Sequence, residues 1–195
     1  MTENADAVAL TRAERRRRSE GLIVDAARSL FADQGYERTT IRAVAERAGV
    51  DAALVMQHFG SKEALFAAVA RWGVPMDDLG RASRDDVPHA ALRHVLDVFE
   101  DESQRSGAEA LLRSSLTHTG AGDVMREQVI GEPLARLGDT IGGPDAALRA
   151  ALLNACTIGL TISRYLLRIP ALADADPADL ERVLEPALRA LVDPD

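Results

Sequence analysis

Hydrophobic residues recur three or four positions apart through most of the chain, a spacing that places them along one side of an α-helix. No segment shows the sustained alternation of polar and apolar residues that a half-buried strand needs, and no hairpin turns flank such a segment. The pattern therefore predicts an all-α fold.

Four helices are predicted in the first seventy residues. The first runs from about residue 15 to residue 34, and Gly35 is well placed to end it. Short helices then follow over residues 41–48, capped by Thr39 or Thr40 and broken by Gly49, and over residues 52–59, capped by Asp51. Ser61 can cap a fourth helix.

Residues 72–88 are predicted to form a helix end and a connector, and further helices are predicted after it. We expect breaks at Gly107, Gly120–Gly122, Gly142–Pro144 and Pro170–Pro177, where glycine or proline interrupts the pattern. Pro186 should kink the final helix. The predicted helices cover residues 88–104, 107–119, 122–138, 145–168 and 177–192.

Charge divides the chain unevenly. The net charge is −8, yet residues 1–62 balance at +1 and residues 63–195 at −9. Such asymmetry suggests a nucleic-acid contact at the less acidic end. We expect three parts: a disordered arm at residues 1–14, a small helical module at 15–72 and a larger helical domain at 73–195.

The cellular setting follows from cysteine and from apolar runs. Cys156 is the only cysteine, so no internal disulfide can form, which favours a reducing compartment. We find no apolar run long enough to span a bilayer and no secretory signal at the N-terminus. We therefore expect a cytoplasmic protein that does not contact membranes and carries no cofactor or metal.

Residues 40–66 have the pattern of a helix-turn-helix. Two short amphipathic helices flank the turn at residues 48–50, and the methyl group of Ala45 lets them cross closely. This motif places the start of its second helix in the DNA major groove. The residues expected inside the angle are Ile41, Val44, Val50, Leu54, Val55 and Phe59.

The stretch from Ile23 to Val69 resembles the tetracycline-repressor (TetR/AcrR) family of transcriptional regulators. Three strings carry the resemblance: LFADQGYERTT, IRAVAERAGV and HFGSKEALF. The resemblance implies a homodimer that offers one recognition helix to each half of a palindromic double-stranded operator, and a repressor more than an activator.

The same resemblance assigns roles to single residues. It implies phosphate contacts for Thr40, His58 and Lys62, and a base-edge contact for Arg42. Ala52, Ala53 and Gln57 would form the exposed face of the recognition helix. For two of these residues an alternative to DNA contact remains. Arg42 is then only a solvated helix residue, and His58 only packs against Phe59. Met56 departs from the family, which commonly has a phosphate-binding tyrosine there.

Arg12 and the run Arg15–Arg18 form the densest positive charge of the chain. Two interpretations stay open for them. They are either the solvated start of a helix or an arm that follows the phosphate backbone or enters the minor groove.

Residues 150–168 are apolar on nearly every side, with two ordered exceptions. Small residues centred on Gly159 suggest a close helix contact across a dimer, facing a seam on the final helix that runs from Leu180 to Leu191. The dimer residues we predict are Leu152, Cys156, Gly159, Leu184 and Leu188.

The second exception is a polar stripe of Asn154, Thr157, Thr161, Arg164 and Arg168. The first four of these could line a cavity for an unknown small-molecule effector, with Trp72, Phe99, Leu112 and Leu116 as apolar walls. Alternatively, the polar side chains bond neighbouring helices or lie at the edge of the dimer interface.

Two other classes of function remain. An enzyme is disfavoured because the four histidines lack metal-binding spacing, and no GxSxG, P-loop or dinucleotide motif occurs. A helical interaction protein whose helix-turn-helix has lost its affinity for DNA stays open, because Met56 and the two alanines weaken the contact set.

Overall fold

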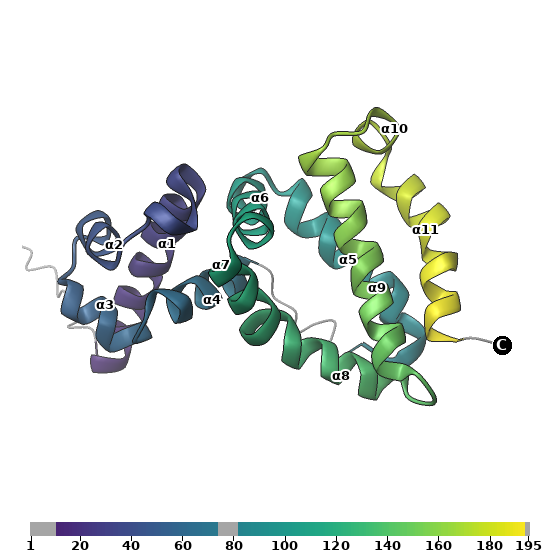
Figure 1. Cartoon of the computed structure of the whole chain (residues 1–195), viewed down its shortest axis with the longest axis horizontal. Helices are drawn as coiled ribbons and strands as arrows, with labels where there is room; N and C mark the ends of the chain where they lie inside the picture. The colour runs from purple at the N-terminus through teal and green to yellow at the C-terminus, as the bar shows by residue number, and fades with distance from the viewer. Residues whose placement is uncertain (1–10, 74–81, 194–195) are drawn as a thin grey trace, which may run out of the picture.

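The computed structural model describes residues 11–73 and 82–193 and contains no strand within them, so the predicted all-α fold is confirmed (Figure 1). Four N-terminal helices lie at one end of the elongated molecule, and the C-terminal helices lie at the other. Residues 1–10 of the expected arm and residues 74–81 of the expected connector lie outside the described residues.

The N-terminal helices begin and end at local signals. α1 (Arg12–Arg38) starts three residues earlier than predicted, because Thr11 and Glu14 form a capping box around its first turn. Gly35 interrupts its helical backbone with a φ of 79°, as a left-handed stop requires. α2 (Ile41–Ala48), α3 (Ala52–Phe59) and α4 (Lys62–Gly73) confirm the predicted helices.

The C-terminal helices differ from the prediction in their breaks. α5 (Val87–Glu100) ends at Asp101, and α6 (Glu102–Thr117) runs straight through Gly107. A short α7 begins after His118 and passes without a break through a π-helical stretch, η3, into α8. Their bounds are α7 Thr119–Val124, η3 Met125–Ile130 and α8 Gly131–Ile141.

Close packing explains the two wrongly predicted breaks. A Cβ atom at Gly107 would lie 3.0 Å from the side chain of Arg28, and one at Gly122 would lie 2.9 Å from the carbonyl oxygen of Ser115. Glycine therefore permits close approach at these positions without ending a helix.

The last third of the chain follows the prediction more closely. α9 (Ala146–Thr161) continues through a second π-helical stretch, η4 (Ile162–Leu166), and a one-turn α10 (Pro170–Ala173) follows after three non-helical residues. α11 (Pro177–Val192) has the predicted bounds, and Asp176 caps it. Figure 1 shows α9 and α11 side by side at the end of the molecule away from α2 and α3.

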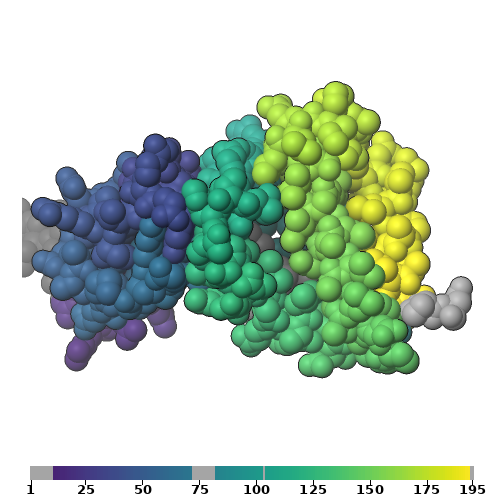
Figure 2. Space-filling view, viewed as in Figure 1, coloured from purple at the N-terminus to yellow at the C-terminus, as the bar shows by residue number. Residues whose placement is uncertain are grey.

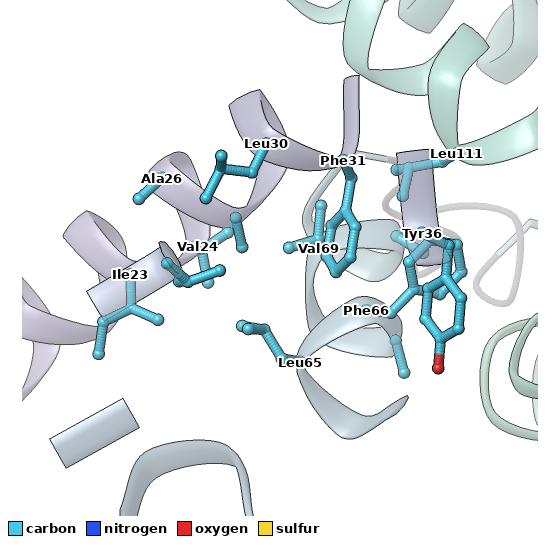
Figure 3. Packing of buried hydrophobic residues seen from close by; sticks show 14 of the residues in the cluster. Ile23, Val24, Ala26, Leu30, Phe31, Tyr36, Leu65, Phe66, Val69 and Leu111 are labelled. Atoms are coloured by element: carbon cyan, nitrogen blue, oxygen red, sulfur yellow. The ribbon is translucent and has the colours of Figure 1, made fainter. Parts of the chain in front are cut away.

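Two large hydrophobic cores hold the described residues together, beside a small cluster of Val98, Phe99 and Ala108. The first joins α1–α4 around Phe31, Tyr36 and Phe66, whose rings pack edge to face or stacked (Figure 3). Leu111 of α6 reaches into this core. The second core lies among α5, α8, α9 and α11. Because α6 and α7 contribute to the first core, the two predicted parts share a packed boundary.

The helix from Ala146 to Leu166 is long and apolar enough to cross a membrane by length and composition, although we expected no such run. In this fold it packs against α5, α8 and α11. Only 28% of its most apolar window is buried within the chain, so a large apolar face of this helix remains uncovered.

Candidate nucleic-acid interface and ligand cavity

α2 and α3 form the predicted helix-turn-helix. Gly49 takes the left-handed conformation (φ 67°, ψ 33°) between them, and the backbone nitrogen of Val50 donates to the carbonyl oxygen of Ala45 at 3.0 Å. Val44, Ala45 and Val55 are buried inside the angle. The tight turn therefore holds α3 against the first core and leaves its other face to solvent.

The outer face of the motif carries the predicted base-reading side chains. Arg42, Ala53 and Gln57 are exposed, and no hydrogen bond or ion pair ties Arg42 or Gln57 to another described residue. Met56 is 45% exposed on the same helix. Ala52 is half-buried against the first core, so it presents less surface than Ala53.

Thr40 caps α2, since its hydroxyl oxygen accepts from the backbone nitrogen of Ala43 at 3.1 Å. The side chain is exposed, and its hydroxyl proton can still be donated to a phosphate oxygen. Asp51 caps α3 in the same way by accepting from Ala53 at 2.7 Å. The predicted phosphate contact of Thr40 is therefore compatible with its capping role.

Lys62 contacts two neighbours within its own chain, and His58 lies beside Phe59, as the second sequence interpretation of His58 expected. The Nζ of Lys62 donates to the carbonyl oxygen of Glu37 at 3.2 Å and lies 4.3 Å from the ring centroid of Tyr36. His58 is half-buried with its ring 6.0 Å from that of Phe59. Lys62 thus links the start of α4 to the end of α1.

Tyr36 completes this junction. Its hydroxyl donates to Oε1 of Glu63 at 3.2 Å. Burial, together with the nearby negative charge of Glu63, raises the pKa of Tyr36 to about 12. Tyr36 therefore stays neutral and keeps this bond throughout the physiological pH range.

The N-terminal arginines are exposed at the start of α1. Arg12 and Arg15–Arg18 form no ion pair with any residue in the described part of the chain. Their first turn is helical, so four consecutive side chains point in different directions around the axis.

A cavity of about 440 Å³ lies among α5, α6, η3 and α9. Figure 2 shows the surface hollowed between the green α6–α7 region and the lighter green α9. Six of the predicted ligand-binding residues line it, and the side chain of Trp72 lies outside the described residues. The six are Phe99, Leu112, Leu116, Asn154, Thr157 and Thr161.

Arg164 does not line the cavity, contrary to our prediction. Its side chain is 6% exposed and donates from Nε (3.1 Å) and Nη2 (2.8 Å) to Oε1 of Glu100. Nη1 donates to the carbonyl oxygens of Leu172 and Ala175. Arg164 therefore fastens η4 to α5, to α10 and to the segment just after α10, which is the structural alternative for the polar stripe. Arg168, the last member, is exposed beyond η4.

Replacing Arg164 with methionine should lower the free energy of unfolding by about 2 kcal/mol, because its carbonyl partners lose a charged donor. Burial favours a higher pKa for Glu100, but hydrogen bonds from Arg164 and Tyr165 outweigh it and lower the pKa below 4.5. The stabilisation from the pair of Arg164 and Glu100 should be fully present above pH 4.5. It should be lost as the pH falls through the lowered pKa of Glu100. Urea unfolding from about pH 7 to pH 3 measures both effects.

A matched variant makes this test specific. Arg182→Met removes an exposed arginine whose one partner among the described residues is Asp179, three residues before it, and should change stability little at any pH. Equal stability of Arg164→Met and the wild type at neutral pH would contradict the fastening role.

The predicted dimer residues divide between the two helices. Leu152, Cys156 and Gly159 form an exposed row on α9. Leu188, in contrast, is 0% exposed inside the second core of its own chain, and Leu184 is half-buried against the same core. A partner subunit therefore cannot reach Leu188. The face of α11 that a partner subunit can reach carries the exposed residues Val183 and Ala187. This face lies about 100° around the helix axis from Leu184 and Leu188.

Comparison with known proteins covers both parts of the chain. The family model described as "Bacterial regulatory proteins, tetR family" matches residues 23–69, and the model "Tetracyclin repressor-like, C-terminal domain" matches residues 85–192. The first is the stretch that contains α2 and α3, and the second contains every described residue of the cavity lining except Ala70.

Among curated relatives, the transcriptional repressor AcnR of Corynebacterium efficiens is 45% identical over 49 residues, 25% of this chain and 26% of that protein. The transcriptional regulator HbdR of Aromatoleum sp. is 34% identical over 83 residues, 43% of this chain and 27% of that protein. The chain thus matches only about a quarter of the length of each.

Solved structures match over nearly the whole chain. A TetR-family regulator from Streptomyces coelicolor A3 superimposes with a TM-score of 0.72 at 29% identity, covering 94% of this chain and 99% of that one. NalD of Pseudomonas aeruginosa, a repressor of a multidrug efflux pump, gives a TM-score of 0.70 at 21% identity, covering 89% and 96%. The second likeness shows the fold alone.

Proposed function

The chain belongs to the tetracycline-repressor family of bacterial regulatory proteins, and from this premise we propose that it is a ligand-responsive repressor of transcription. In this proposal a homodimer binds a palindromic operator in the cytoplasm, and a small-molecule effector releases it. The observation that carries the proposal is the outward face of α2 and α3, whose polar side chains are free to read bases.

Base reading is assigned to two side chains. Arg42 can donate two hydrogen bonds to the major-groove edge of guanine, and the amide of Gln57 can pair with adenine. Both are exposed and make no bond within the described residues, so no internal contact must break before they meet DNA. Ala53 can offer its methyl group to thymine.

Dimerisation is assigned to the end of the molecule away from α3. Large apolar side chains remain exposed there, including Leu152 on α9 and Val183 on α11. Burying such a patch stabilises a dimer through the hydrophobic effect. A two-fold axis through this face would present two copies of α3 to successive major grooves of one operator.

Effector response is assigned to a wall that the cavity shares with the first core. Ala70 of α4, Leu111 of α6 and Val129 of η3 line the cavity and also belong to that core. A ligand that displaces this wall also displaces the C-terminal part of α4. Because α4 directly follows α3 in the chain, this movement reaches the helix-turn-helix. Ligand and DNA then weaken each other's binding by the same factor.

Gln57→Ala should weaken operator binding by about 1–3 kcal/mol and relax the preference at one base pair, because the amide is the proposed reader of that base. Lys62→Ala should weaken binding to every DNA sequence, by less than Gln57→Ala weakens binding to the operator, because a phosphate contact does not depend on the base sequence. Fluorescence anisotropy on an inverted repeat from the DNA flanking the gene, compared with scrambled DNA at several salt concentrations, measures both.

Arg136→Ala is the matched control. It removes one positive charge from α8, where Arg136 pairs with Glu132 on the exposed surface, and should leave DNA binding unchanged. Equal losses on operator and scrambled DNA for Gln57→Ala would remove Gln57 from the reading set. Weak binding of the wild type to all DNA, without sequence preference, would refute the repressor function and favour the helical interaction protein.

A further inference from the structure

The described lining of the cavity is mostly hydrocarbon and includes no carboxylate. Leucine, isoleucine, valine, phenylalanine and alanine side chains make up most of the described lining, and no aspartate or glutamate belongs to it. A cationic ligand would therefore lose its hydration without gaining an anionic partner, which is costly in an apolar site.

The hydroxyl groups of the lining have already donated their protons. Ser115 donates to the carbonyl oxygen of Leu111 at 2.8 Å, Thr157 to that of Asn154 at 2.9 Å, and Thr161 to that of Thr157 at 2.8 Å. Each bond stays within one helix, as is common for these residue types. These side chains can still accept a hydrogen bond, but they offer a ligand no donor.

Arg126 is the one lysine or arginine in the described lining, and carboxylates already hold it. Its Nη2 lies 2.7 Å from Asp123 and 3.2 Å from Glu127. The hydrogen bond to Asp123, followed by that to Glu127, raises the pKa of Arg126. The side chain is also largely exposed to water. An anionic ligand beside it would meet two negative charges together with the positive one.

Asn154 differs from the other polar lining residues. It lies on α9, is half-buried and faces the cavity, and its side-chain amide forms no hydrogen bond with any described residue. An amide offers two donors and one acceptor. His94 of α5 also lines the cavity, with its Nε2 atom buried.

We infer that the cavity selects an electrically neutral, largely apolar molecule with one hydroxyl or carbonyl group, which the amide of Asn154 holds. A volume of about 440 Å³ lies within the range of small-molecule sites, which are mostly apolar with a few placed polar groups. The inference rests on the proposed function, because it treats this cavity as the effector site.

Thermal unfolding of the full chain without DNA tests the charge preference. The probes are decan-1-ol, decanoate and decylammonium, and a bulkier set of naphthalene-2-methanol, 2-naphthoate and naphthalene-2-methylammonium. At about pH 8 the carboxylate probes are anionic and the ammonium probes are cationic. At least one neutral probe should raise Tm by about 3 °C at roughly ten times its Kd, while its charged counterparts should not.

Two variants test the role of Asn154. Asn154→Leu keeps the size of the side chain and removes the amide. It should weaken binding of the neutral probe roughly fivefold by calorimetry, and it should leave unchanged the binding of the same hydrocarbon without its hydroxyl group. Asn154→Asp introduces a carboxylate of nearly the same shape and should shift the preference towards the ammonium probe.

Three results would overturn the inference: stabilisation by an anionic or cationic probe equal to that by the neutral one, no stabilisation by either neutral probe, or no change in neutral-probe affinity in Asn154→Leu. None of these measurements includes DNA. Failure of the wild type to bind any operator would instead refute the proposed function, while the probe preferences would still decide the chemistry of the cavity.

Discussion

Gly159→Arg should convert the proposed homodimer into monomers and lower operator affinity by roughly 100-fold or more, because two half-sites are then no longer bound together. A Cβ atom at Gly159 meets nothing within 4 Å in its own chain, so the variant fits the folded subunit. Across a close two-fold contact, however, the side chain would bury an unpaired charge. Analytical ultracentrifugation and operator titration measure the two effects.

Two controls separate this result from a general effect of added charge. Ala135→Arg places the same residue at an exposed position on α8 and should leave dimer and affinity intact. Gly159→Ala adds one methyl group and should have a much smaller effect. A dimer that persists in Gly159→Arg, with unchanged operator affinity, would place the subunit contact elsewhere.

Arg149→Met should have the largest effect on stability, lowering the free energy of unfolding by about 4 kcal/mol. Arg149 is only 9% exposed. Its guanidinium donates to Val192 at 2.9 Å and to Pro144 at 3.1 Å, and also to the carbonyl oxygens of Leu191 and Gly142. Methionine fills much of the space but leaves these carbonyl oxygens without their donor.

This loss should lower Tm by on the order of 10 °C, which scanning calorimetry measures. Arg149→Lys retains the charge but cannot span both segments, so an intermediate loss is expected. Arg136→Met removes only an exposed arginine and serves as the control. A Tm for Arg149→Met within about 2 °C of the wild type would show that the carbonyl oxygens find other partners.

Helix bounds were predictable where a cap is encoded within a few residues. Thr40, Asp51 and Asp176 each accept a hydrogen bond from a backbone nitrogen two or three residues later, and the helices after them start as predicted. Gly107 and Gly122 misled the prediction because a glycine that ends a helix and one that admits a neighbour look alike in sequence. The deciding contacts come from other helices or from an earlier turn.

The candidate sites show the same division. Exposure of Arg42 and Gln57 follows from helical periodicity within one motif and was predictable. Arg164 shares a polar stripe with Thr157 and Thr161, yet its partners are Glu100 and backbone oxygens at residues 172 and 175. Periodicity places residues on a face of a helix, but it does not tell whether a cavity or another segment covers that face.

The shared wall between the cavity and the first core also bears on redesign of this protein as a biosensor. Ala70 and Leu111 cannot be changed for a new ligand without repacking the core that supports the helix-turn-helix. Leu116 and Asn154 line the same cavity outside that core. Libraries that vary this second pair should yield altered ligand preference with fewer variants that lose DNA binding, so directed evolution should begin there.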